Sequence, residues 1–150
     1  MTGLAFLGQI AVVEKQLIAA KKRVERYKAD MDYVNRLSQT GKVSQTSDVT
    51  RNESMVIKYM EAVDQVTALI QEKNVIIDRV EEKLMQMQTI NGSEMLRGIH
   101  IEYKPVPDVA NELHYSRQGA YKLKDRALRE LDRILAAEEQ ADRQQSAVAV

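Results

Sequence analysis

The sequence predicts an all-α protein in which a long antiparallel helical hairpin, coiled-coil-like in its packing, precedes a C-terminal helix-turn-helix. Two long seams predict the hairpin, because apolar residues at alternating intervals of about three and four mark a helix face that packs on another helix. A basic segment that follows two prolines and a short turn predicts the helix-turn-helix. The chain has no tryptophan and a single phenylalanine, and its many alanine, glutamine, leucine and charged residues are typical of long helices.

The first seam begins at Ile10 and defines one face of the first expected helix. Its positions are Ile10, Val13, Leu17, Ala20, Val24, Tyr27, Met31 and Val34. The second seam comprises Val56, Tyr59, Val63, Val66, Ile70, Lys73, Ile77, Val80, Leu84 and Met87. Lys73 interrupts it, either snorkelling to solvent or fixing the register of the pair. Further apolar residues flank this second seam and indicate more than one packing neighbour: Ile57, Met60, Leu69, Ile76 and Met85.

A polar segment separates the two seams and predicts a reversal of the chain. Residues 38–52 are rich in Ser, Thr, Gln, Asp and Gly and show no apolar periodicity, as in a loop. The first helix carries an excess of basic residues and the second an excess of acidic residues, which favours docking of one on the other. We therefore expect residues 1–90 to form the hairpin and to serve oligomerisation.

The C-terminal part is expected to begin after a turn at Asn91, Gly92 and Ser93, because these residue types favour turns. Asn91 or Ser93 would then cap a short helix that starts near Glu94. Residues 91–136 are predicted to form the helix-turn-helix domain. Beyond Leu135 the chain becomes small and polar, so residues 137–150 are predicted to be a frayed or disordered tail.

Residue spacing within 105–123 fits the helix-turn-helix. Pro105 and Pro107 suit the entry to its first helix, where a missing N–H costs little. His114 stands in the turn, where glycine is usual, and we expect it to adopt a left-handed conformation. Ser116 is the expected N-cap of the second helix. Ala110, Ala120 and Leu123 have the sizes and offsets needed where the two helices cross.

The second motif helix, residues 116–131, offers donor-rich side chains of the kind that read base edges in the major groove. The candidate DNA contacts are Ser116, Arg117, Gln118, Tyr121, Lys122, Lys124, Arg126 and Arg129. Arg117 and Gln118 suit guanine and adenine edges, whereas Lys124, Arg126, Arg129 or Arg133 suit phosphates. The whole chain has zero formal charge, so any DNA affinity must be local to this basic segment. The alternative is a packed helical hairpin with a solvated charged face.

Several function classes find no support in the sequence. There is no cysteine, no glycine-rich phosphate loop and no nucleophile paired with a base, so we expect neither an enzyme nor a cofactor. His100 and His114 make no metal site by themselves. The carboxylate pairs at 81–82 and 138–139 are expected to be solvent-facing charges rather than catalytic groups. Without about 20 consecutive apolar residues or a charged leader, we expect a cytoplasmic protein with no membrane partner.

The stretch from Leu96 to Leu131 resembles phage-encoded late-operon transcriptional regulators of the ArpU and RinA type, whose C-terminal part is similar to region 4 of sigma factors. The residues that carry the resemblance are Val109, Ala110, Leu113, Tyr115 and Ser116 in the middle of the motif and Arg126, Ala127 and Leu128 in its tail. Residues 104–107 depart from the family, which has a bulky Thr/Ser-Trp/Tyr entry there. The resemblance implies DNA contact by Ser116, Arg117, Gln118, Tyr121 and Lys122, location in the host bacterial cytoplasm, and contact with host RNA polymerase.

The leading hypothesis is a sequence-specific DNA-binding transcriptional regulator, an activator of phage late genes, that binds double-stranded DNA as a homo-oligomer. A second hypothesis is a DNA-packaging adaptor similar to a small terminase subunit, which would assemble as a ring of many copies. A third is a structural coiled-coil interaction protein that binds no DNA. Native mass and DNA binding at low salt separate the three.

Overall fold

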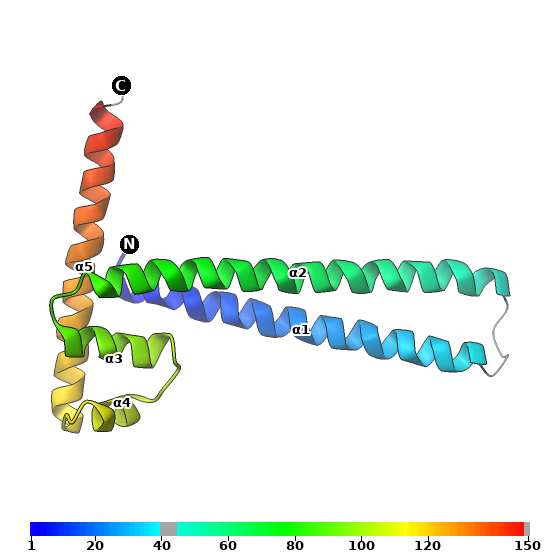
Figure 1. The fold of residues 1–150 in the computed structure, drawn as a ribbon, viewed down its shortest axis with the longest axis horizontal. Coiled ribbons are helices and arrows are strands. Elements are labelled where there is room, and N and C mark those ends of the chain that lie inside the picture. Colours follow the sequence, from blue (N-terminus) through cyan, green and yellow to red (C-terminus); the bar gives the residue numbers. More distant parts are fainter. Residues whose placement is uncertain (40–44, 149–150) are drawn as a thin grey trace. The chain divides into compact units, whose positions relative to one another are not determined.

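The computed structural model describes residues 1–39 and 45–148, and the side chains of residues 1–37 and 51–148. Over these residues the chain forms five helices: α1 (Gly3–Gln39), α2 (Gln45–Met85), α3 (Ile90–His100), α4 (Val106–Glu112) and α5 (Arg117–Val148) (Figure 1). The predicted fold class is confirmed, because the protein is all-α and the long helices α1 and α2 form a hairpin in extensive contact.

The seam predicted for α1 is confirmed along its whole length. Ile10, Val13, Leu17 and Ala20 are buried, and the later positions of the seam are half-buried. Polar side chains also join α1 to α2. Arg23 donates a hydrogen bond of 2.9 Å to Oε1 of Gln65, and Lys73 forms an ion pair with Glu14. Lys73, which interrupts the seam of α2, is therefore half-buried and paired with a carboxylate of α1.

The seam predicted for α2 is confirmed in its second half, where Val80, Leu84 and Met87 are buried, and only partly in its first half, where Tyr59 and Val66 are half-buried. Val56, Val63 and Ile70 remain exposed, whereas Ala62 is buried. The prediction gave weight to the larger β-branched side chains, but the face of α2 that approaches α1 carries a small alanine at its centre. Several apolar side chains on α2 consequently remain exposed, and Val63 borders a groove with Lys21 and Glu25 of α1.

The chain divides into two compact units. The head unit comprises Met1–Val12 with Asn74–Val150, and the arm unit comprises Val13–Lys73. The head unit thus includes one end of each hairpin helix, whereas the sequence suggested a boundary at residue 90. The reason is a shared core in which residues from α1, α2, α3 and α5 pack together: Phe6, Leu7, Ile10, Val80, Leu84, Met87, Leu96, Ala127, Leu131 and Leu135.

Ion pairs and hydrogen bonds at the edge of this core attach α5 to the hairpin helices. Lys83 is buried, and its Nζ lies 2.8 Å from Oε2 of Glu138. The backbone N–H of Gly3 donates to Asp132, and the N-terminal amine lies 2.9 Å from Glu139. The carboxylates of residues 138 and 139, expected to be solvent-facing charges, therefore have structural partners.

The turn predicted at Asn91–Ser93 is wrong, because α2 ends at Met85 and α3 already begins at Ile90. Gly92 lies inside the first turn of α3 and is buried. A Cβ atom added to it would lie 3.1 Å from Cβ of Ala127. The glycine thus permits close approach of α3 to α5 rather than a chain reversal, and the N-cap position belongs to Thr89.

The predicted ends of two other helices also require correction. Residues 45–52, expected in the loop, belong to α2, while residues 40–44 of that predicted loop lie outside the described residues. Helix α5 continues to Val148, so the predicted tail is helical up to that residue. Its last residues are exposed, and their alanine, glutamate, glutamine and arginine content favours helix without tertiary support.

Among the described residues, one segment is long and apolar enough to cross a membrane by length and composition alone, namely Gly3–Leu37 of α1. A core helix of a soluble protein passes the same test. The apolar side chains of Phe6, Leu7 and Ile10 at its start are buried in the core of the head unit. Their burial accounts for part of the apolar composition of this end of α1, whereas Leu4 and Val12 are exposed.

Candidate nucleic-acid interface

A second core within the head unit holds α3, α4 and α5 together. It contains Met95, Val109, Ala110, Ala120 and Leu123. Ala110 and Ala120 are buried at the positions where small residues were predicted. A Cβ atom added to Gly98 would lie only 2.8 Å from Cγ2 of Val109, so α3 and α4 also approach closely.

Proline determines where α4 begins. Pro105 occupies the N-cap position with extended backbone angles, φ −61° and ψ 148°, and Pro107 lies in the first turn. Neither position needs a backbone N–H for an intrahelical hydrogen bond. Asp108 also lies in the first turn, where a negative charge opposes the positive end of the helix dipole. The predicted entry to the first motif helix is confirmed.

The turn between α4 and α5 has the predicted conformation. His114 adopts φ 61°, the left-handed region that glycine usually fills. The next backbone N–H, that of Tyr115, donates 2.8 Å to the carbonyl of Ala110. Ser116 Oγ then accepts a 3.1 Å hydrogen bond from the N–H of Gly119, which makes Ser116 the N-cap of α5. The oxygen of the Ser116 hydroxyl is thus engaged in capping, whereas its O–H group can still donate a hydrogen bond to a bound partner.

Four of the predicted DNA contacts share one exposed face at the start of α5. Arg117 and Gln118 are exposed, as are Tyr121 and Lys122 one turn later. Because residues four apart lie on the same side of a helix, these four side chains form a continuous surface. We call this surface the recognition face. Ala120, Leu123 and Ala127 occupy the opposite, buried side.

The remaining predicted contacts on α5 follow the recognition face, since Lys124 lies seven residues after Arg117 and Arg126 lies four residues after Lys122. Arg129 is exposed and lies seven residues after Lys122, which continues the line of the recognition face by two turns. Lys124 is half-buried and lies near His100 at the end of α3. Burial, and then the charge of Lys124, lower the pKa of His100, whose Nε2 is buried without a hydrogen-bond partner.

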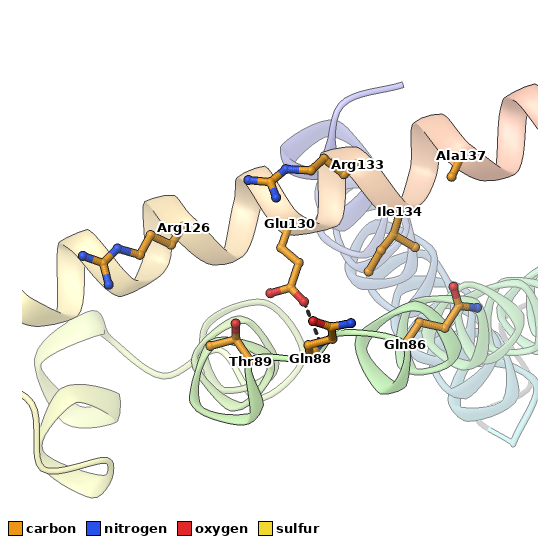
Figure 2. A pocket seen from close by; sticks show the side chains of 8 residues that line it. All are labelled: Gln86, Gln88, Thr89, Arg126, Glu130, Arg133, Ile134 and Ala137. Atoms are coloured by element: carbon orange, nitrogen blue, oxygen red, sulfur yellow. Dashed lines mark hydrogen bonds between the residues drawn. The ribbon is translucent and has the colours of Figure 1, made fainter.

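Arg126 belongs to a groove that the sequence did not predict. Figure 2 shows Arg126, Glu130 and Arg133 on α5 above the connection between α2 and α3. Glu130 accepts a 2.6 Å hydrogen bond from the backbone N–H of Gln88. The groove is open, measures about 560 Å³ and is also lined by Gln86, Gln88, Thr89, Ile134 and Ala137. Its lining comes from segments far apart in the sequence, so the spacing of residues 126, 130 and 133 on one side of α5 is its only local signal.

Two further basic side chains of the head unit, Arg97 and Lys104, have carboxylate partners. Arg97 Nη2 lies 2.8 Å from Oε2 of Glu81 and also pairs with Glu94. Lys104 Nζ lies 2.9 Å from Glu102 and 3.0 Å from Glu112, and these hydrogen bonds raise the pKa of Lys104. Across the part of the chain that the structure describes, no group of His, Asp and Glu side chains is arranged to hold a metal ion.

Comparison with known proteins adds no assignment, since no protein-family model, curated protein or solved structure matches the chain significantly.

Proposed function

We propose that this chain is a sequence-specific DNA-binding transcriptional regulator that places the start of α5 in the major groove of double-stranded DNA. The observation that carries the proposal is the arrangement of α4, its turn and α5, with four long polar side chains exposed on the recognition face. A helix used in this way presents its N-terminal turns to base edges while the preceding helix supports it. The second core of the head unit, which holds α3, α4 and α5 together, fixes both the exposed start of α5 and the supporting helix α4.

Local charge supports the same proposal. Between His114 and Arg133 the basic side chains are Arg117, Lys122, Lys124, Arg126, Arg129 and Arg133, against Asp125, Glu130 and Asp132. Glu130 is already occupied with the backbone of Gln88, so it competes less for the neighbouring arginines. A basic surface in a chain of zero net charge attracts a polyanion locally without a long-range field.

The residues divide by role according to their position. Arg117 and Gln118, in the first turn of α5, are suited to bidentate contact with guanine and adenine. Arg129, further along the same line, is suited to a phosphate. Arg126 and Arg133 line the groove of Figure 2 and are likewise suited to phosphates.

The resemblance to phage late-operon regulators extends the proposal. It adds that the chain activates phage late genes in the host bacterial cytoplasm, as a homo-oligomer and in contact with host RNA polymerase. These parts rest on the resemblance of residues 96–131, and the DNA-binding part rests on the geometry of α4 and α5.

The test is selection of binding sites from a randomised duplex pool with the purified full-length chain, followed by titration of the selected site. Arg117→Ala should weaken binding to that site by about 1–3 kcal/mol and relax the base preference at one position. Arg36→Ala, an exposed arginine in the arm unit, is the matched control and should bind like the parent chain. Failure to enrich any sequence, with no binding at low salt, would refute the proposal.

A further inference from the structure

A row of exposed apolar side chains follows α2 along the arm unit. It consists of the apolar residues Val56, Met60, Val63 and Ile70 together with Thr67, and the intervals alternate between four and three residues. Met60 is 58% exposed, and Val56 and Ile70 are each 41% exposed. The hydroxyl of Thr67 donates 3.1 Å to the carbonyl of Val63, so its polar group is satisfied within the helix. An interval pattern of this kind is the one by which a helix packs against a further helix.

The same face of the arm unit continues onto α1. Lys21 and Glu25 of α1 line a shallow groove of about 270 Å³ together with Val63 and Thr67 of α2. Helical spacing extends this line on α1 to Ile18, Lys21, Glu25, Lys28 and Asp32, all exposed. The face therefore pairs an apolar row on α2 with a row of alternating charges on α1. We call it the apolar face.

The other side of the arm unit is polar. A second groove there is lined by Arg23, Tyr27, Lys58, Glu61, Ala62 and Gln65. Arg23 is bonded to Gln65, and its neighbour Arg26 stacks 5.3 Å from the ring centre of Tyr27. The contrast between the two sides leaves the apolar face as the surface that gains from a partner.

We propose that the apolar face binds the apolar face of a second copy of this chain, antiparallel, about a two-fold axis that crosses both helices. The charges on α1 are arranged for this symmetry. Lys21 and Asp32 lie equally far on either side of the midpoint between residues 26 and 27, and so do Glu25 and Lys28. In the antiparallel pair, each lysine therefore meets a carboxylate of the second copy.

Four of the five positions of the row on α2 have the same symmetry, and the fifth, Ile70, falls opposite Glu53. Met60 and Val63 lie equally far from the midpoint between residues 61 and 62, as do Val56 and Thr67. Tyr27, Glu61 and Ala62 line one groove, so the midpoint on α1 and the midpoint on α2 lie at the same level of the hairpin. A single two-fold axis thus relates these four positions on each helix.

The size of the surface agrees with a stable dimer. The described part of the arm unit is about 36 Å long at 1.5 Å per residue and two helices wide, which gives roughly 700 Å² per copy. Standard interfaces bury about 800 Å² per partner. A second copy is favoured over another protein because the face is complementary to itself, as a two-fold interface requires. The proposal deepens the self-association included in the proposed function, but it does not depend on DNA binding.

The first test is the mass of the full-length chain by sedimentation equilibrium without DNA. We expect twice the 17.1 kDa of one chain. Met60→Glu combined with Val63→Glu brings carboxylates together at the axis and should raise the dimer dissociation constant on the order of 100-fold or more. Gln65→Glu with Ala68→Glu adds the same charge to other exposed positions of α2 and should leave the mass unchanged. Circular dichroism checks that every variant remains helical.

The second test addresses the register. Lys21→Glu and Asp32→Lys should each raise the dimer dissociation constant by roughly 3- to 10-fold. The double variant should restore the parent value, because the two charges of the pair are then swapped and still attract. Lys22→Glu, at the neighbouring exposed position, is the control and should have no effect. A monomer at all concentrations, an assembly larger than a dimer, or two weakened single variants without restoration would each overturn the proposal. Because neither test uses DNA, a negative result here is separate from failure of the proposed function.

Discussion

The head unit and the arm unit use the same kind of helical sequence pattern, but most of the fully buried apolar side chains lie in the head unit. In the head unit Leu7, Met95 and Leu131 are each 0% exposed. Leu7 and Leu131 belong to the core shared by α1, α2, α3 and α5, and Met95 belongs to the core of α3, α4 and α5. In the arm unit Met60 is 58% exposed and Ile57 56% exposed, because α1 and α2 pack only on each other over its described residues. The difference shows that an apolar heptad row indicates a helix interface without indicating whether the partner lies in the same chain.

The comparison is tested most strongly by removing a large side chain from each unit. Leu131→Ala should lower the free energy of unfolding by about 3–4 kcal/mol, because a fully buried leucine leaves a cavity among four helices. Val56→Ala, at a position 41% exposed, should lower it by less than about 1 kcal/mol in the monomer. Urea denaturation at low protein concentration measures both. Equal losses would contradict the distinction between the units.

A pair of glycines separates close helix packing from an open helix face. Gly98→Ala should destabilise the head unit by about 1–3 kcal/mol, since the new Cβ meets Val109 at 2.8 Å. Gly8→Ala has nothing within 4 Å of its Cβ and should stabilise α1 by about 0.5–1 kcal/mol. Thermal unfolding of the two variants should therefore shift in opposite directions. A gain in stability for Gly98→Ala would show that α3 and α4 are more loosely packed than described.

The left-handed residue of the motif turn gives a smaller effect. His114→Gly should raise the free energy of unfolding by about 0.5–1 kcal/mol, because glycine adopts φ 61° without steric cost and the histidine side chain is exposed. His114→Val is the opposing variant and should destabilise the chain, since β-branched residues rarely adopt this conformation. Chemical denaturation of both variants decides whether the turn is strained.

The smallest effect concerns pH. Because burial and the charge of Lys124 lower the pKa of His100, the folded chain binds fewer protons than the unfolded chain below about pH 6.5. Stability from the neutral histidine is therefore present above that pH and is lost as the pH falls. Between about pH 7.5 and 5.5, the Tm of His100→Gln should fall less than that of the parent chain. If the Tm of the two chains fell equally with pH, the pKa of His100 would be the same in the folded and unfolded chain.

Much of the fold follows from local signals in the sequence. The seam of α1, the prolines at the start of α4, the cap at Ser116 and the left-handed His114 were all predictable, because each depends on one helix or one turn. The division into units was not, because Phe6 and Leu135 meet only through tertiary packing. The role of Gly92 was mistaken for the same reason, since the atom it accommodates belongs to Ala127 on another helix.

The candidate interface divides in a similar way. Helical spacing was sufficient to place Arg117, Gln118, Tyr121 and Lys122 on one exposed face. It was insufficient for Lys124 and Arg126, whose surroundings are supplied by α3 and by the connection between α2 and α3. The DNA contacts predicted at these two positions therefore stay predictions, with surroundings that the sequence did not show.

The most direct test of the central claim is a salt-dependent DNA titration of three chains: the parent, Arg117→Ala with Lys122→Ala on the recognition face, and Arg36→Ala with Lys22→Ala on the arm unit. The two double variants lose the same charge, so a difference between them reports position rather than net charge. The account predicts selective, salt-sensitive binding that only the recognition-face variant loses. Equal weakening of both variants, or no binding by the parent at low salt, would contradict it.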